Sequence, residues 1–343
     1  MKILSCVGKF LDQPKLINGL NRSMPMILVG GAGFVIAKQT LESDNKSKTF
    51  IKETATLLGV VGSSLLAVKG LKFRGKQIFE GLIHNHSKAV PNEVADRFSK
   101  AVNDNEIKKI IEKSKTKILS FKNITKLMEH AQMNPEGQKF MDEFIPSPHS
   151  HNAKEILGEI KRLSLIGLVP VLGGIVGGTV GDGLTDESWR SKIPDKLKEG
   201  FYQYFANIFL CNIGAGAALA ATEVLEAKKV IKPSKVTRAA AMVGGVLGVG
   251  VFGGSAIANL MGQKVINPIF KHKKHGKIYD ERVPDALDIS LHVDDMASVG
   301  VLSGFKWVEP ALPLLYSVSG YRAGIGYRNH HHHHGYHKDK KEN

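Results

Sequence analysis

Residues 163–181 read LSLIGLVPVLGGIVGGTVG, an uncharged segment between Arg162 and Asp182. A helix needs roughly 20 consecutive apolar residues to cross the hydrocarbon core of a bilayer. The segment therefore predicts a membrane-spanning helix. Its many glycines predict close packing of that helix, because small residues let two backbones approach each other in lipid.

Two further segments have the same character. Residues 200–222 (GFYQYFANIFLCNIGAGAALAAT) and 239–263 (AAAMVGGVLGVGVFGGSAIANLMGQ) contain no charged side chain. Each is long enough for a complete span. The three segments together predict the all-α class, as a multi-pass membrane helical protein with four to six spans.

Three weaker segments are candidates for the remaining membrane spans. Residues 24–37 and 54–68 are uncharged but short, so they span only if lysines at their ends extend to the interface. The alternative for this pair is a buried helical hairpin of a soluble domain. Residues 296–320 are long enough, but they carry Lys306 and Glu309 in their middle.

The charge composition bears on whether the partner is a nucleic acid or a membrane lipid. The chain has 343 residues with 47 Lys and Arg against 32 Asp and Glu, a formal net charge of +15. Acidic residues are interleaved with the basic ones and few aromatic residues accompany them, so a soluble nucleic-acid-binding protein is disfavoured. Basic groups beside membrane segments favour membrane lipids with anionic headgroups as partners.

Four domains are expected along the chain. They are an N-terminal segment with a short apolar helical hairpin (1–69), a basic soluble helical insertion (70–161), a Gly-rich membrane helical domain (162–325) and a disordered His/Lys-rich tail (326–343). Within the insertion, a helix is predicted to begin near Asp104, because Ile107, Ile110 and Ile111 then share one face.

Small residues recur at a spacing of four in two of the apolar segments. Such residues lie on one helix face, and they predict helix packing within the bundle or between copies in a homo-oligomer. The predicted helix-packing residues are Gly173, Gly177 and Gly181 in the first segment and Gly250, Gly254, Ala258 and Gly262 in the second.

Lys306 and Glu309 are a candidate intramembrane polar pair. Three-residue spacing puts them on one helix face, and an unpaired charge in lipid is costly. One interpretation places the pair in the bundle interior, beside the helix break at Pro310 and Pro313, where it would mark an ion or substrate path. The favoured interpretation is a bent segment at the surface with both charges in water.

No enzyme motif and no cofactor are predicted. The sequence lacks a Gly-Lys-Ser/Thr phosphate loop, a His-Glu-x-x-His pair and a Gly-x-Ser-x-Gly elbow. A weak candidate for metal binding is the tail, where imidazoles can gather zinc, nickel or copper without a folded site. These histidines are His330, His331, His332, His333 and His334.

Basic loops predict the orientation. The N-terminus, the insertion, the loop 223–238 and the tail would lie in the cytoplasm of a six-span protein, although the basic loop 264–295 would then be translocated. The expected role is a non-enzymatic membrane scaffold or assembly factor. The alternative is a transporter or channel for a small ion or solute, with Lys306, Glu309, Asn207 and Asn212 as its polar candidates.

Overall fold

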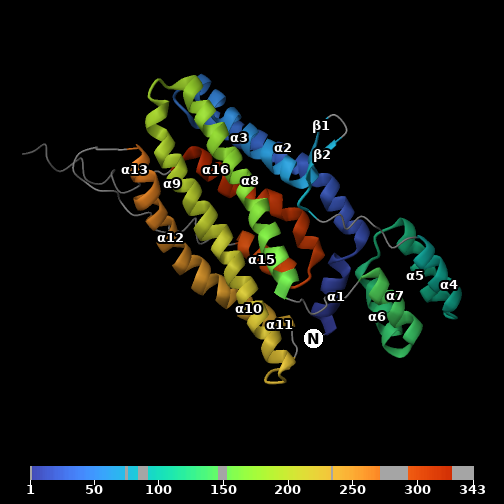
Figure 1. Ribbon diagram of the computed structural model, residues 1–343. Helices are drawn as coiled ribbons and strands as arrows, with labels where there is room; N and C mark the ends of the chain where they lie inside the picture. The colour runs from blue at the N-terminus through green and yellow to red at the C-terminus, as the bar shows by residue number, and fades with distance from the viewer. Residues whose placement is uncertain are drawn as a thin grey trace, which may run out of the picture.

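The computed structural model describes residues 2–73, 76–83, 92–145, 153–232, 235–270 and 293–326, nearly all of them helical. Long helices lie side by side in one bundle, and a separate group of four short helices lies beside one end of it (Figure 1). Four helices are long and apolar enough to cross a membrane. The predicted all-α class with membrane-spanning helices and a soluble helical insertion is confirmed.

The first two long helices are α2 (Pro14–Glu42) and α3 (Lys46–Lys69). Both extend well beyond the apolar segments 24–37 and 54–68, so each reaches the length of a span. The alternative of a buried soluble hairpin does not fit α2, because Met26, Phe34 and Leu41 are each at least 70% exposed. Such side chains are typical of a surface that faces lipid.

The next two are α8 (Ala153–Thr185) and a longer helical run that follows a short 3₁₀ turn, η1 (Trp189–Lys192). This run consists of α9 (Ile193–Tyr204), the π-helical stretch η2 (Phe205–Phe209) and α10 (Leu210–Ala227). They contain the predicted spans 163–181 and 200–222.

The predicted span 239–263 lies in a helical run with two π-helical stretches. Its parts are α11 (Lys235–Gly245), η3 (Val246–Gly253), α12 (Gly254–Met261), η4 (Gly262–Ile266) and α13 (Asn267–Phe270). The wider π turn keeps Gly245 and Gly250 on one face although they are five residues apart. Gly245 meets Gly214 and Gly250 meets Cys211, both on α10.

The last predicted span, 296–320, is not one helix. The chain forms α15 (Val293–Leu302), a 3₁₀ turn η5 (Lys306–Ala311) and α16 (Leu312–Ile325). Gly304 adopts φ +86°, a left-handed conformation that suits glycine, and the chain reverses there. The hydroxyls of Ser298 and Tyr316 consequently meet at 2.7 Å across the two helices.

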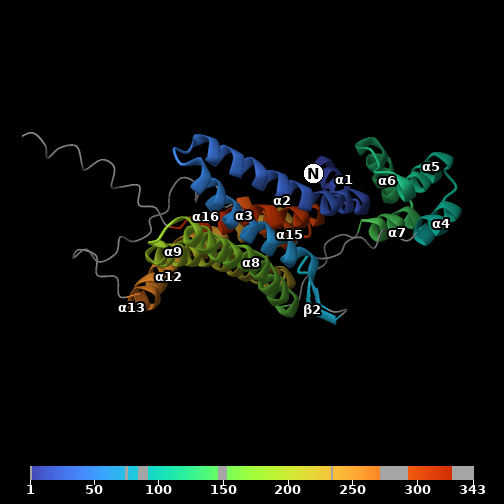
Figure 2. The same cartoon turned by 90° about the horizontal axis from the view of Figure 1, so that it is seen from above.

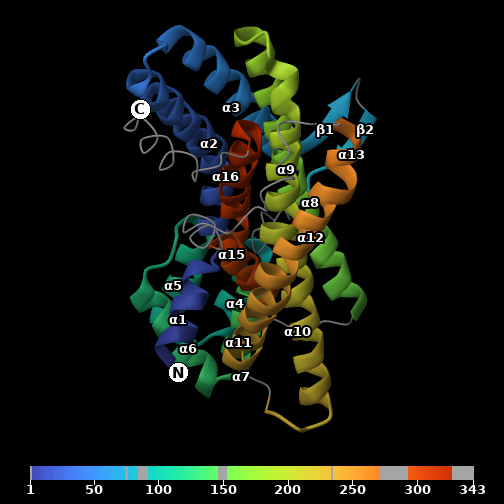
Figure 3. The same ribbon diagram turned by 90° about the vertical axis from the view of Figure 1, so that its left-hand side faces the viewer.

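This reversal changes the expected topology. The carbonyl of Gly324, near the end of α16, accepts a hydrogen bond from Lys196 at the start of α9. That end of the bundle is opposite to the one from which the insertion leaves α3 and returns to α8 (Figure 1). The tail therefore starts at the end opposite the insertion, whereas the six-span prediction placed both on one side. Figure 3 shows α16 between the α2–α3 hairpin and helices α8 and α9.

The insertion begins with a two-stranded antiparallel hairpin, β1 (Gly70–Phe73) and β2 (Lys76–Glu80). Four helices follow, which are α4 (Asn92–Ala101), α5 (Asn105–Thr116), α6 (Phe121–Met133) and α7 (Pro135–Phe144). They enclose their own apolar core, in which Phe140 contacts Phe98 and Phe144. The helix predicted near Asp104 is α5, and the Asp104 carboxylate caps it.

Helix α1 (Lys2–Leu11) and the start of α2 join this helical domain to the bundle (Figure 2). The side-chain amide of Gln13 donates to the carbonyl of Leu119 and accepts from the N–H of the same residue. The ammonium of Lys9 donates to the carbonyl of Ile145. At the other side of the insertion, α8 already begins at Ala153, so the predicted division at residue 161 lies inside a helix.

Glycines set the spacing of the bundle interior. A Cβ atom on Gly173, Gly177 or Gly181 would collide with the backbone or side chains of α3. One on Gly174 or Gly178, on the neighbouring face of α8, would collide with backbone carbonyls of α16. Helix α8 therefore lies between α3 and α16, in backbone contact with both.

Candidate functional site

A buried charge cluster closes the end of α8. The Asp182 carboxylate is 1% exposed, and the ammonium groups of Lys52 on α3 and Lys196 on α9 each lie 2.9 Å from one of its oxygens. Lys196 is equally buried and also donates to the carbonyl of Gly324 on α16. One carboxylate thus connects α3, α8 and α9, and Lys196 extends this network to α16.

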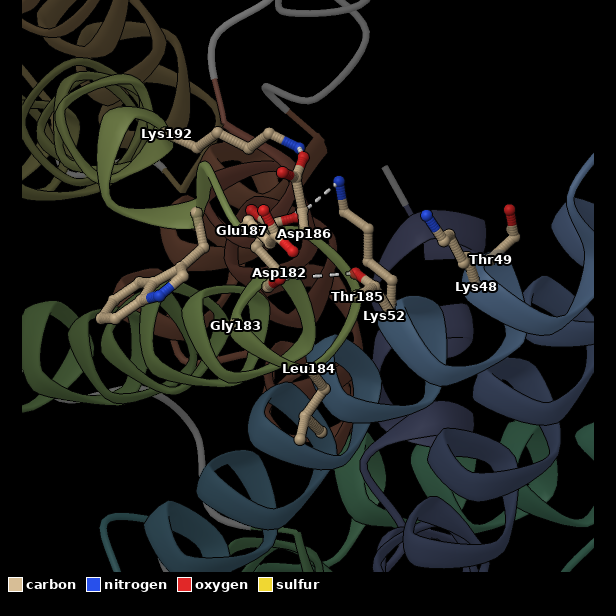
Figure 4. Close-up of a pocket in the computed structure, with 11 residues that line it drawn as sticks. Lys48, Thr49, Lys52, Asp182, Gly183, Leu184, Thr185, Asp186, Glu187 and Lys192 are labelled. Atoms are coloured by element: carbon tan, nitrogen blue, oxygen red, sulfur yellow. Dashed lines mark hydrogen bonds and ion pairs between the residues drawn. The ribbon is translucent and has the colours of Figure 1, made fainter.

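An open pocket of about 930 Å³ lies over this cluster (Figure 4). Lysines and a threonine of α3 stand on one side. On the other side stand Asp182 near the end of α8, the acidic residues that follow α8, and Lys192 at the end of η1. The lining residues are Lys48, Thr49, Lys52, Asp182, Gly183, Leu184, Thr185, Asp186, Glu187, Trp189 and Lys192.

Two of the lining charges are paired with each other. The Lys192 ammonium lies 2.6 Å from the Asp186 carboxylate, which also accepts from the Ser188 hydroxyl and N–H. These contacts, the Lys192 ammonium first, hold the pKa of Asp186 well below its usual range. Asp186 is therefore a carboxylate at any physiological pH.

A line of polar side chains leads inward from the cluster along α9. Lys196, Glu199, Gln203 and Asn207 follow at spacings of three and four, so they share one helix face. The Asn207 amide donates to Gln203 at 2.9 Å, and the Gln203 amide donates to Glu199 at 2.8 Å. The guanidinium of Arg322 on α16 lies 3.5 Å from Glu199. All four side chains are buried, the first three on α9 and Asn207 on η2.

The line continues across the π-helical stretch to α10 and α15. Cys211 is one turn beyond Asn207. Its thiol donates to the carbonyl of Ala206 and also interacts with the carboxyl group of Asp295. Asp295 is buried at the N-terminal end of α15, and Ser298 on the next turn contacts the Tyr316 hydroxyl. We call this set of side chains, from Lys196 to Tyr316, the polar seam.

A second charge cluster lies at the opposite end of α8. Arg162 donates to Glu309 of η5 at 2.5 Å, to Glu159 at 2.6 Å and to the Leu82 carbonyl at 2.8 Å. Arg162 and Asp182 are 20 positions apart, which is about 30 Å along a helix and equals the thickness of a hydrocarbon core. The two clusters thus mark the two ends of the uncharged part of α8.

Apolar side chains separate the polar seam from the Arg162 cluster. Leu163, Leu302 and Leu312 are fully buried in the same core, one from each of α8, α15 and α16. The seam therefore begins at the Asp182 cluster and stops at Tyr316, before the second cluster.

The predicted residues fall in different places. Gly173, Gly177 and Gly181 contact α3, Gly250 and Gly254 contact Cys211 and Ala206, and Ala258 packs in a small core with Tyr202 and Ala206. Beside Gly262 the space is open. Glu309 pairs with Arg162 and is buried, whereas Lys306 is half-buried and forms no ion pair within the part of the chain that the structure describes. The candidate Lys306–Glu309 pair is therefore replaced by Arg162–Glu309. The favoured interpretation was correct that the segment is bent, but wrong that both charges lie in water, because Glu309 is buried.

The predicted metal ligands His330 to His334 lie outside the described residues. Within those that are described, no group of three or more His, Cys, Asp or Glu side chains is placed to hold a metal ion. Of the polar candidates in the apolar segments, Asn207 belongs to the seam. The Asn212 amide is buried beside it with no hydrogen-bond partner in the described structure.

Sequence reasoning missed most of the seam. Asp182 was considered only as the charge that ends the segment 163–181, and Lys196, Glu199 and Asp295 lie outside every predicted span. One available signal was the spacing from Lys196 through Glu199 and Gln203 to Asn207, which repeats a single helix face. No sequence pattern links these residues to their partners on α15 and α16, because the partners lie about 100 positions later in the chain.

Comparisons with known proteins give no relative. No protein-family model matches the chain, and no curated protein or solved structure resembles it. Functional inference therefore rests on the geometry alone.

Proposed function

We propose that the chain is a multi-pass integral membrane protein that moves a small cation along the polar seam. The observation that carries this proposal is the hydrogen-bonded line of buried side chains from Glu199 through Gln203 to Asn207, inside helices long enough to span a bilayer. Polar and ionisable side chains are expensive at membrane depth, and they commonly mark ion or substrate paths.

The chemistry of the seam favours a cation. Glu199, Asp295 and the amides supply oxygen acceptors, which are the ligands that hard cations prefer. The Asp182 cluster closes one end by ion pairs, and the leucines at 163, 302 and 312 close the other. Movement of an ion then requires that the Asp182 cluster opens and that α15 or α16 shifts.

The proposed orientation follows the basic residues. The N-terminal stretch, the insertion and the loop after α10 leave the bundle at one end, and that loop carries Lys228, Lys229 and Lys232. Excess lysine and arginine in short loops favours the cytoplasmic side. The insertion end is therefore assigned to the cytoplasm and the Asp182 end to the opposite side.

Flux into proteoliposomes tests the proposal. Purified protein in vesicles loaded with sodium-, potassium- or proton-sensitive dye should pass one of these cations down its gradient. Asn207→Leu and Gln203→Met keep the side-chain size but remove the oxygens, so they should abolish most of the flux. Asn18→Leu, on the outer helix α2, is the matched control and should retain it. No flux of any of the three cations in folded wild-type protein would refute the proposal.

A second candidate is a membrane scaffold or assembly factor without transport activity. The observation in its favour is that the helical domain α4–α7 is fixed to the bundle by Gln13 and Lys9. A rigid domain at a constant height above the membrane suits the positioning of another protein. This role predicts that the folded protein passes none of the three cations, with the domain present or with it removed by joining α3 directly to α8.

A further inference from the structure

The pocket over Asp182 lies where a phospholipid headgroup would lie. It is bounded by the first turns of α3 and the last turns of α8, at the end of the uncharged part of both helices. Trp189 lines it, and tryptophan side chains favour the interface between hydrocarbon and water. The Arg190 guanidinium stacks over the Trp189 ring at 5.3 Å from its centroid.

An exposed apolar stripe runs from the pocket along α8. Leu172, Val176, Val180 and Leu184 follow at a spacing of four, and each is at least half exposed. Leu184 itself lines the pocket. The stripe is about 18 Å long at 1.5 Å per residue, close to the half-thickness of a hydrocarbon core of about 30 Å. It can therefore support an acyl chain whose headgroup is in the pocket.

The charges in the pocket favour a headgroup with one charge of each sign. Lys52, Asp182, Asp186 and Lys192 are all engaged in ion pairs. Two lining charges remain, Lys48 on the α3 side and Glu187 on the opposite side, and in the part of the chain that the structure describes neither has an ion-pair partner. Figure 4 shows them on opposite sides of the pocket.

We propose that this pocket binds a zwitterionic aminophospholipid, of which phosphatidylethanolamine is the simplest. Its phosphate lies at Lys48, its ammonium donates to Glu187, and an acyl chain lies on the α8 stripe. A primary ammonium can hydrogen-bond to a carboxylate, whereas the quaternary ammonium of phosphatidylcholine cannot. An anionic lipid would leave Glu187 facing a negative headgroup. The inference rests on the membrane placement of the bundle and not on cation movement.

Trp189 provides a local readout. The chain has two tryptophans, so Trp307→Phe leaves Trp189 as the only one. This variant is reconstituted into phosphatidylcholine vesicles with equal small fractions of phosphatidylethanolamine, phosphatidylglycerol or phosphatidylcholine that carry brominated acyl chains. Quenching of Trp189 then reports which lipid is enriched beside it. Brominated phosphatidylethanolamine is expected to quench Trp189 about twofold more than the other two lipids. The expected ratio is small because ion pairs at an exposed surface contribute little free energy.

Matched variants separate the pocket from the surface in general. Lys48→Ala and Glu187→Ala, both exposed, should lower the quenching by phosphatidylethanolamine to the level of phosphatidylcholine. Asp44→Ala and Lys46→Ala, exposed charges at the same end outside the pocket lining, should not. Equal quenching by all three lipids, or stronger quenching by phosphatidylglycerol, would overturn the proposal.

A competition arm identifies the source of the headgroup. An excess of free phosphoethanolamine in the buffer should leave the phosphatidylethanolamine preference unchanged, because the free molecule lacks the acyl chain. Loss of the preference would assign the pocket to a soluble zwitterion instead. Since the readout is local to Trp189, a protein that moves no cation can still give the expected result, so the two proposals fail separately.

Discussion

At the scale of single residues, charged side chains in this protein are placed where one helix must be held against another. Arg162 joins Glu309 of η5 to the carbonyl of Leu82 after the hairpin. The Asp182 carboxylate joins α3 to α9 through ion pairs with Lys52 and Lys196. Apolar side chains pack about equally well against lipid and against protein, so dispersion contacts alone do not specify which helices are neighbours. Ion pairs between helices add that specificity.

Removing one partner of the Arg162–Glu309 pair should destabilise the bundle strongly. Arg162→Met takes away the guanidinium from a carboxylate that is 1% exposed, at an expected cost of about 3–5 kcal/mol. Glu309→Leu alone should also destabilise. The double variant should be less destabilised than the sum of the two, measured as thermal unfolding in detergent. Additive effects would show that the pair is not coupled.

The Asp104 cap should make α5 sensitive to acid. The N–H groups of Ile107 and Glu106 donate to its carboxylate and lower the pKa of Asp104. Because the folded-state pKa is the lower one, its stabilisation is fully present above the unfolded value of about 3.9 and is lost as the pH falls through the folded value. The loss of stability is measured as faster amide hydrogen exchange in α5 as the pH falls.

The comparison variant for this test is Asp104→Asn, which keeps an N-cap acceptor without the charge. At neutral pH the wild-type α5 should be better protected than that of the variant, and the difference should close in acid. A difference that stays constant down to pH 2 would contradict the assignment.

At the scale of elements, α8 is confined on two faces by glycines that leave no room for a side chain. Gly178→Leu would push α16 away, because a Cβ at Gly178 already meets the backbone of Gly324. Overpacking costs typically about 1–3 kcal/mol, and contact with a backbone carbonyl leaves little room for relaxation. The folded yield in detergent should therefore fall.

Gly248→Leu is the control for this prediction, since the space beside Gly248 is open. It should leave the folded yield and melting temperature in detergent unchanged. If both substitutions behave alike, contact between α8 and α16 is not what fixes the bundle.

At the scale of the whole molecule, the arrangement predicts which loops share a side of the membrane. Asp44, between α2 and α3, lies at the Asp182 end, and Lys232, after α10, lies at the insertion end. Single cysteines at these positions, with Cys6 and Cys211 replaced by alanine, should be labelled from opposite sides by a membrane-impermeant thiol reagent. In intact cells Asp44→Cys should react and Lys232→Cys should react only after permeabilisation.

Release of the protein into the soluble fraction by alkaline carbonate would contradict membrane integration altogether. Labelling of both cysteines from the same side would instead contradict the helix order described above. Carbonate extraction therefore tests membrane integration, and cysteine labelling tests the order in which the helices cross the membrane.

Much of this architecture follows from the sequence alone. Long uncharged segments such as 163–181 determine spanning helices, because the membrane requirement depends on length and polarity and these are local properties. The caps and the apolar stripe that define α5 are equally local. The glycine spacing also indicated which face of α8 meets another helix, since periodicity is a property of one helix.

Only the tertiary structure decided which residues meet. Glu309 pairs with Arg162 rather than with Lys306 because the chain reverses at Gly304, and this placed the end of α16 opposite the insertion. The polar seam likewise joins α9 to residues about 100 positions later on α15 and α16. Contacts between distant segments depend on the packing of all helices at once, and no local pattern records that packing.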